Sequence, residues 1–181
     1  MVTAMTSRER WIDEGMRVLA EEGVSGVRID RVAKRLGLTK GSFFHHFDGV
    51  AAYRTALLQR WEGQTLDDRG DAPPQAILED LAARVGTLLD LRLEAAVRAW
   101  AFQDPEAAAA QQRVDQARLA ALETIWSRII DDPVRARAAA MLPHLLAIGA
   151  AVALPSTSQE DLESAFGLLA ELIPSVSSTS R

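Results

Sequence analysis

The 181-residue sequence contains no cysteine. This absence excludes a disulfide framework, a thiolate zinc site and a cysteine nucleophile. The N-terminal stretch MVTAMTSRERW lacks the apolar core of a secretory signal, so a cytoplasmic location is expected. The sequence also lacks a P-loop and the motifs G-x-G-x-x-G, H-E-x-x-H and G-x-S-x-G. We therefore expect a protein that is not an enzyme and that holds no cofactor.

Strand patterns are missing as well. No run of β-branched residues alternates with polar ones over a strand length, whereas alanine, leucine, arginine and glutamate are abundant. The apolar spacing predicts an all-α fold of about nine helices. Residues 138–158 carry no charged side chain, but Pro143 and His144 interrupt the run. A helix buried between other helices is expected there, rather than a membrane span.

Helix start and stop signals predict two domains. Thr6 and Glu9 have the spacing of a capping box, and Gly23 and Gly37 each follow a helical stretch. The polar, proline-bearing stretch 67–74 is the best boundary in the chain. We predict an N-terminal head over 6–66, a helical body over 67–174 and a frayed tail over 175–181. The first predicted helix begins at Thr6. The others cover 29–36, 40–47, 50–66, 75–92, 94–103, 105–130, 133–154 and, after a cap at Ser158, 159–173.

The charges are distributed unevenly. Residues 1–60 hold ten Lys/Arg and seven Asp/Glu, a balance of +3, whereas the remaining residues hold ten and eighteen, a balance of −8. A basic front half on an acidic body points to an anionic partner for the front half.

Residues 29–47, IDRVAKRLGLTKGSFFHHF, carry the functional signal. Two short amphipathic stretches flank a tight glycine turn, with Ala33 where the helices approach closely and with Phe43 and Phe47 as inner-face residues. This is the pattern of a helix-turn-helix, whose second helix enters the DNA major groove. Thr39, Lys40 and the residues that follow can donate to phosphates or base edges. Arg31, Lys34 and Arg35 are expected to add positive charge.

Metal binding near His45 and the partner of Arg98 are two further questions that the sequence raises. His45, His46 and Asp48 could be metal ligands, but adjacent helical histidines point about 100° apart, so no metal site is expected. Arg98 is expected either to pair with Asp115 or Glu123, which is slightly favoured, or to face a ligand.

From Gly23 through Ile29-Asp30-Arg31-Val32-Ala33 to the run over 36–47, the sequence resembles the TetR (tetracycline-repressor-like) family of transcriptional regulators. The resemblance covers residues 8–60. It implies a three-helix DNA-binding head, a ligand-binding helical body and a homodimer formed by the last two long helices. The implied DNA contacts are Arg28, Thr39, Lys40, Gly41, Ser42, Phe44, His45 and His46.

The sequence departs from the family pattern at two places. Phe44 stands where the family usually has tyrosine, which removes a hydroxyl donor. Asp48-Gly49-Val50 stands where a lysine is usual, which removes a positive charge.

The body carries two further sets of candidate residues. The ligand pocket is expected to use Leu57, Trp61, Leu88, Arg98, Trp100, Phe102, Leu122 and Trp126. The dimer interface is expected to use Leu146, Ala147, Ala150, Ala151, Phe166 and Leu169, because small residues let helices pack closely.

Together these observations predict a homodimeric repressor. It would bind a palindromic double-stranded DNA operator and be released by a small apolar ligand, with no membrane partner. The alternatives are an activator, or an architectural or interaction protein without a small-molecule effector. Sequence-selective DNA binding distinguishes the regulator from the architectural protein.

Overall fold

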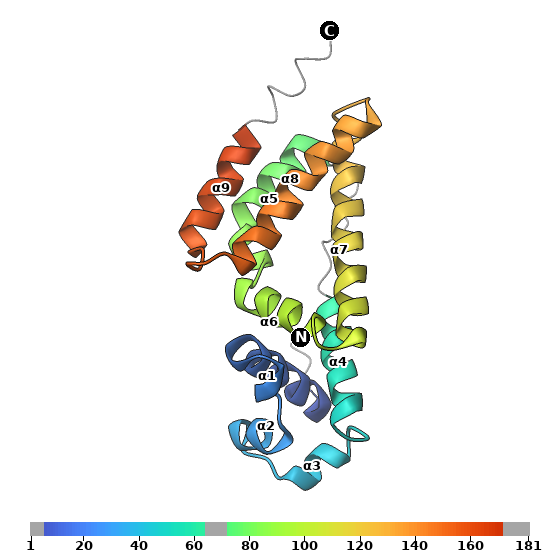
Figure 1. The fold of residues 1–181 in the computed structure, drawn as a ribbon, viewed down its shortest axis with the longest axis vertical. Helices are drawn as coiled ribbons and strands as arrows, with labels where there is room; N and C mark the ends of the chain where they lie inside the picture. The colour runs from blue at the N-terminus through green and yellow to red at the C-terminus, as the bar shows by residue number, and fades with distance from the viewer. Residues whose placement is uncertain (1–5, 64–71, 172–181) are drawn as a thin grey trace. The chain divides into compact units, whose positions relative to one another are not determined.

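The structure, a computed structural model, describes residues 6–63 and 72–171. Every long element in these ranges is a helix, which confirms the all-α prediction (Figure 1). A 3₁₀ turn at Val24–Gly26 joins the first two helices. The α-helices are α1 (Ser7–Glu22), α2 (Ile29–Leu36), α3 (Lys40–Phe44), α4 (Val50–Glu62), α5 (Pro74–Leu88), α6 (Leu91–Ala101), α7 (Pro105–Trp126), α8 (Pro133–Val152) and α9 (Gln159–Glu171).

The chain forms two compact units. The first combines residues up to 64 with residues 92–114, and the second combines residues 65–91 with those from 115 onward. The first unit therefore holds α1 to α4, α6 and the first half of α7, and the second holds α5, the rest of α7, α8 and α9. The functional division into 6–66 and 67–174 stays a prediction.

Local signals set the ends of the first helices. Thr6 caps α1: its hydroxyl accepts from the Glu9 N–H at 3.2 Å, and the Glu9 carboxylate accepts from the Thr6 N–H at 2.7 Å. These hydrogen bonds lower the pKa of Glu9. Gly37 ends α2 in the left-handed conformation, with φ of 67°. Both ends fall where the sequence predicts them.

Four aromatic side chains join α1, α3 and α4. The Tyr53 ring lies 5.3 Å from Phe43 and 4.8 Å from Phe47, and the Trp11 ring lies 5.3 Å from Phe43, measured between centroids. The Tyr53 hydroxyl donates to the backbone carbonyl of Trp11, and its burial raises the pKa of Tyr53. A Cβ atom at Gly15 would lie 2.1 Å from the Tyr53 hydroxyl. The absence of a side chain at Gly15 therefore lets α4 approach α1.

Several predicted helix ends shift. The helix predicted over 40–47 ends at Phe44, because the chain turns through His45 and His46 and reverses at Gly49, whose φ is 103°. The helix predicted over 75–92 ends at Leu88, and Leu89 is extended before α6 begins. The helix predicted over 105–130 ends at Trp126. The predicted ends at 66 and 173, most of the 67–74 linker and the tail lie outside the described residues.

The second unit has two small cores. One gathers side chains of α5, α7 and α8 around Trp126 and Leu122, and the other gathers Val85, Leu89, Ala150 and Leu162. The charge-free run is mostly α8, which continues through Pro143. In the described part of the chain, no helix is long and apolar enough to cross a bilayer.

The close approach at Gly15 predicts a specific loss of stability. Gly15→Ala forces the Cβ against the Tyr53 ring, which the hydroxyl bond fixes, so the free energy of unfolding should fall by about 1–3 kcal/mol. Gly63→Ala is the matched control, because its Cβ would meet backbone atoms at an ordinary 3.5 Å. Denaturant unfolding measures both variants. Equal stability of Gly15→Ala and the wild type would show that α4 does not depend on this contact.

Candidate nucleic-acid interface

Helices α2 and α3 form the predicted helix-turn-helix. Between them, the Leu38 N–H donates to the Ala33 carbonyl at 2.9 Å, and the Gly37 N–H donates to that of Lys34 at 3.3 Å. Val32 and Ala33 on α2 and Phe43 on α3 are buried. The Thr39 hydroxyl caps α3 by accepting from the Ser42 N–H at 3.3 Å. A turn closed by these bonds fixes the direction in which α3 presents its outer side chains.

The predicted DNA-contact residues gather on one short segment. We call residues 39–46 the recognition segment; it contains α3 and the turn after it. Thr39, Lys40, Gly41 and His45 are exposed there, and Ser42 and His46 are half-buried. Arg28 lies apart, just before α2, where it is exposed and pairs with Asp30 at 3.2 Å.

The aromatic residues of this region divide into two kinds. Phe43 and Phe47 are buried, which confirms their predicted core role, so they offer no stacking surface for bases. Phe44 is 61% exposed and packs edge-on against Phe43 at 5.3 Å. An exposed phenyl ring can contact the methyl group of thymine, whereas it cannot donate to a phosphate. Within the described residues, no cluster of three or more His, Asp or Glu side chains could hold a metal ion.

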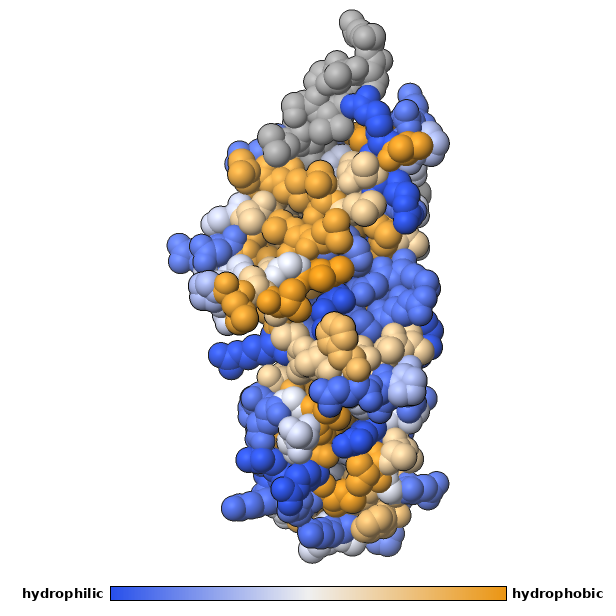
Figure 2. Space-filling view, in the orientation of Figure 1, coloured by the Kyte–Doolittle hydropathy of each residue, from blue (hydrophilic) through white to orange (hydrophobic). Residues whose placement is uncertain are grey.

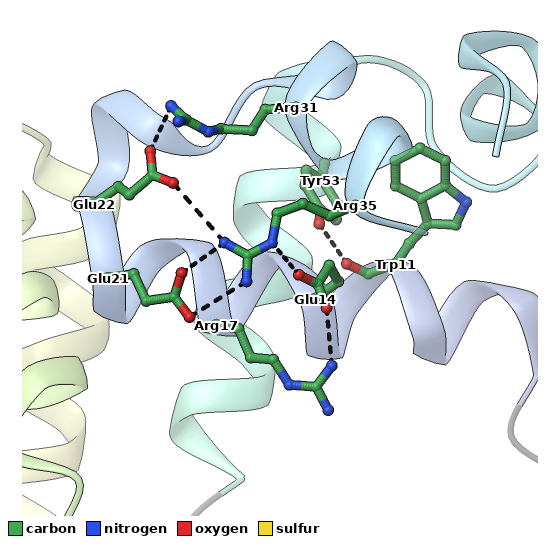
Figure 3. A network of polar contacts seen from close by, with 8 residues as sticks. All are labelled: Trp11, Glu14, Arg17, Glu21, Glu22, Arg31, Arg35 and Tyr53. Atoms are coloured by element: carbon green, nitrogen blue, oxygen red, sulfur yellow. Dashed lines mark hydrogen bonds and ion pairs between the residues drawn. The ribbon is translucent and has the colours of Figure 1, made fainter. Parts of the chain in front are cut away.

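Two arginines of α2 form ion pairs with carboxylates of α1 (Figure 3). Arg35 bonds Glu14 at 2.5 Å and Glu21 at 2.6 Å, and Arg31 bonds Glu22 at 2.5 Å. The Arg35 hydrogen bond lowers the pKa of Glu21. The positive charges that Arg31 and Arg35 were expected to add are therefore paired with carboxylates. They compensate carboxylates of α1, one of which, Glu14, is buried.

The predicted ligand-pocket residues fall in different places. Leu57, Trp61 and Trp100 belong to the core of the first unit, and Leu122 and Trp126 belong to a core of the second. The predicted inward positions of Leu88 and Phe102 are wrong, since these side chains are 40% and 91% exposed. Leu88 is the last residue of α5, and Phe102 lies in the turn between α6 and α7. At such positions helical spacing does not predict which side chains are buried.

Arg98 pairs within its own helix. Its guanidinium lies 3.4 Å from Glu94, and the side chains are 13% and 2% exposed. Glu123, one of the partners expected for Arg98, instead pairs with Arg137. Glu94 is not among the partners expected for Arg98, although the i, i+4 spacing of Glu94 and Arg98 signals this pair.

Some of the residues predicted for the dimer interface pack inside their own chain. Ala150 is buried in a core of the second unit, and Ala147 and Phe166 pack against that core. Leu146, Ala151 and Leu169 are half-buried. Apolar side chains gather on the face over α8 (Figure 2). The large apolar residues exposed on α8 are Val134, Met141, Leu142, Leu145 and Val152.

Known proteins share both the local motif and the whole fold. The family model of bacterial regulatory proteins of the tetR family matches residues 12–51. The repressor DhaR of Mycobacterium sp. (strain GP1) is 28% identical over 88 residues, 45% of this chain and 44% of that protein. The matches span between 26% and 44% of the length of the three curated relatives.

Two solved structures resemble the chain over nearly its full length. A transcriptional regulator from Rhodococcus sp. Rha1 is 26% identical with a TM-score of 0.72, covering 94% of this chain and 97% of that one. FadR from Bacillus subtilis, solved with stearoyl-CoA, is 18% identical with a TM-score of 0.65, covering 91% and 96%.

All these proteins are transcriptional regulators, in agreement with the expectation that the chain is not an enzyme. Regulators of this kind bind DNA operators and act as dimers. Residues 12–51 therefore carry a DNA-binding domain of the tetR family of bacterial regulatory proteins, and the described residues have the fold of these solved transcriptional regulators.

Proposed function

We propose that this protein is a transcriptional repressor that binds a palindromic operator as a homodimer and leaves it when a small apolar molecule binds. The proposal rests mainly on the recognition segment. Its hydrogen-bond donors Lys40 and His45 are exposed, whereas Phe43 and Phe47 anchor the segment in the core. DhaR, which is similar to this chain over 88 residues, is named a repressor. This likeness favours repression over activation.

The recognition segment suits the major groove. Its helix is one short turn with Lys40 at its start, and His45 and His46 follow its end. Lysine donates to guanine O6 and N7 or to phosphate, and imidazole can donate to either. The phenyl ring of Phe44 adds an apolar contact on the same segment. A few side chains of this segment would therefore recognise the base sequence of the operator. Most of the binding free energy would come from contacts with the phosphate backbone of the DNA.

Replacing Lys40 tests this assignment. Lys40→Ala should weaken operator binding and reduce the salt dependence by about one counterion per protomer if the ammonium contacts a phosphate. If Lys40 reads a base, discrimination at one base pair should fall by roughly 1–3 kcal/mol instead.

Lys34→Ala is the matched control for Lys40→Ala, because Lys34 is an exposed lysine of α2 outside the recognition segment. Fluorescence anisotropy with labelled duplexes at several salt concentrations measures each effect. If Lys40→Ala and Lys34→Ala bind alike, Lys40 has no place in the interface. Equal binding of the wild type to all duplexes would favour an architectural protein.

The dimer would form through α8, with α9 beside it. Val134, Met141, Leu145 and Val152 recur at intervals of seven, four and seven residues, which places them on one stripe of α8. Each is at least 36% exposed. Two copies of this stripe, related by a two-fold axis, would bury their apolar surface as part of a four-helix bundle.

A charge in the middle of this stripe should separate the copies. Leu145→Asp would bury an unpaired carboxylate at the centre of the contact, so dimer affinity should fall at least about tenfold. Phe102→Asp is the control, because it places the same charge at an exposed apolar position of the first unit. Sedimentation velocity compares the variants at several concentrations. A dimer that survives Leu145→Asp unchanged would place the interface on another surface.

An apolar effector is the third part of the proposal. FadR, which has the same fold, was solved with stearoyl-CoA, a molecule with a long apolar chain. In this chain Glu94 compensates the Arg98 guanidinium. A neutral ligand is therefore favoured over an acidic one.

A thermal-shift screen of apolar compounds, neutral and acidic in matched pairs, should give stabilisation by neutral members. The same compounds should raise the operator dissociation constant, because a ligand shifts the equilibrium only by preferring the released form. Binders that leave operator affinity unchanged would contradict release by a small molecule.

A further inference from the structure

We propose that Arg8, at the start of α1, contacts a backbone phosphate of the operator, in addition to the residues of the recognition segment. The proposal rests on the proposed DNA-binding function. Its starting observation is that the Arg8 guanidinium lies over the ring of Phe47, 5.2 Å from the centroid. Phe47 directly follows the recognition segment in sequence, and its ring contacts that of His46 at 6.4 Å between centroids. Arg8 is therefore held beside the end of the recognition segment.

Arg8 is one of few cations of the head whose charge is available to DNA. Arg31 and Arg35 are tied to carboxylates of α1, and Arg28 pairs with Asp30. Arg8 is exposed, and no carboxylate of the described residues forms an ion pair with it. A cation near a phosphate stabilises binding by releasing a condensed counterion, so an uncompensated arginine contributes most where other arginines are neutralised.

The contact with Phe47 also prepares Arg8 for this role. The Phe47 side chain is 5% exposed, so the ring is a fixed support. A guanidinium above an aromatic face gains about 0.5–1 kcal/mol at an exposed site. In this position the guanidinium N–H groups remain free to donate hydrogen bonds in the plane of the group. A planar guanidinium can donate two such bonds to one phosphate. A side chain ordered in advance loses less entropy on binding.

The placement of Arg8 complements that of Lys40. Lys40 begins α3, near the start of the recognition segment, and Phe47 directly follows the end of the segment. With Lys40 at the start of α3 and Arg8 held on Phe47, the head carries a cation near each end of the recognition segment. Two such cations can contact phosphates on either side of the bases that the segment reads.

Three substitutions separate the charge of Arg8 from its packing. Arg8→Met keeps an unbranched side chain on Phe47 without the charge, and Arg8→Lys keeps the charge. Arg10→Met is the matched control, because it removes an exposed arginine about 200° around the same helix. Operator affinity is measured by anisotropy at several salt concentrations, together with denaturant unfolding of each variant.

We expect Arg8→Met to weaken operator binding roughly three- to tenfold and to lower the salt slope by about 0.9 per protomer, with little change in stability. Arg8→Lys should keep the salt slope, and Arg10→Met should bind like the wild type. An unchanged slope for Arg8→Met, while Lys40→Ala still weakens binding, would overturn the role of Arg8 alone. Lost affinity that tracks lost stability would make Arg8 a structural residue. A wild type that binds no duplex selectively would instead overturn the proposed function.

Discussion

The hydrogen bond from the Tyr53 hydroxyl to the backbone of α1 holds the DNA-binding head together. It fixes α4 against α1 where Gly15 leaves room, and the same ring packs on Phe43 and Phe47. Helix α3 has five residues, too few for an isolated helix to be stable in water. Its shape therefore depends on tertiary packing, and the single tyrosine of the chain provides much of that packing.

The charges of the head serve two different purposes. Glu14 is buried, and Arg35 and Arg17 surround its carboxylate, so this network ties α2 to α1. A buried carboxylate without these partners would be costly, which explains why Arg35 of α2 pairs with Glu14. The ten Lys/Arg of the first sixty residues therefore overstate the number of cations that are free to meet an anionic partner. Among the exposed cations, Lys40 lies in the recognition segment and Arg8 lies on Phe47 beside it.

Local signals of the sequence predicted the fold well. The capping box at Thr6, the left-handed Gly37 and the buried Phe43 depend on residues close in the chain, so spacing alone predicts them. The end of α3 was missed because the reversal at Gly49 competes with helical periodicity. The exposure of Phe102 was not predicted, because Phe102 continues the apolar spacing of α6 in the sequence. It lies in the turn after α6, however, and does not share the buried face of that helix.

Long-range contacts were beyond the sequence. The pairing of Arg35 with Glu21 joins residues fourteen apart, and no periodicity signals such a contact. The small residues of α8 suggested a contact between protomers, yet Ala150 packs inside its own chain, and the exposed stripe consists of larger residues. A small side chain such as Ala150 indicates that two helices pack closely, but it does not indicate whether the second helix belongs to the same chain or to another. The contact residues of the recognition segment were predictable as a group, because the turn places them together.

Selection of bound duplexes from a random pool tests the central claim most directly, namely that two heads related by a two-fold axis read DNA sequence. The account predicts enrichment of an inverted repeat whose half-sites lie about one helical turn, ~34 Å, apart or slightly more. Selection with Lys40→Ala should enrich the same repeat more weakly, or with a relaxed preference at one base pair of each half-site. Enrichment of no sequence, or of a single site without two-fold symmetry, would contradict the account.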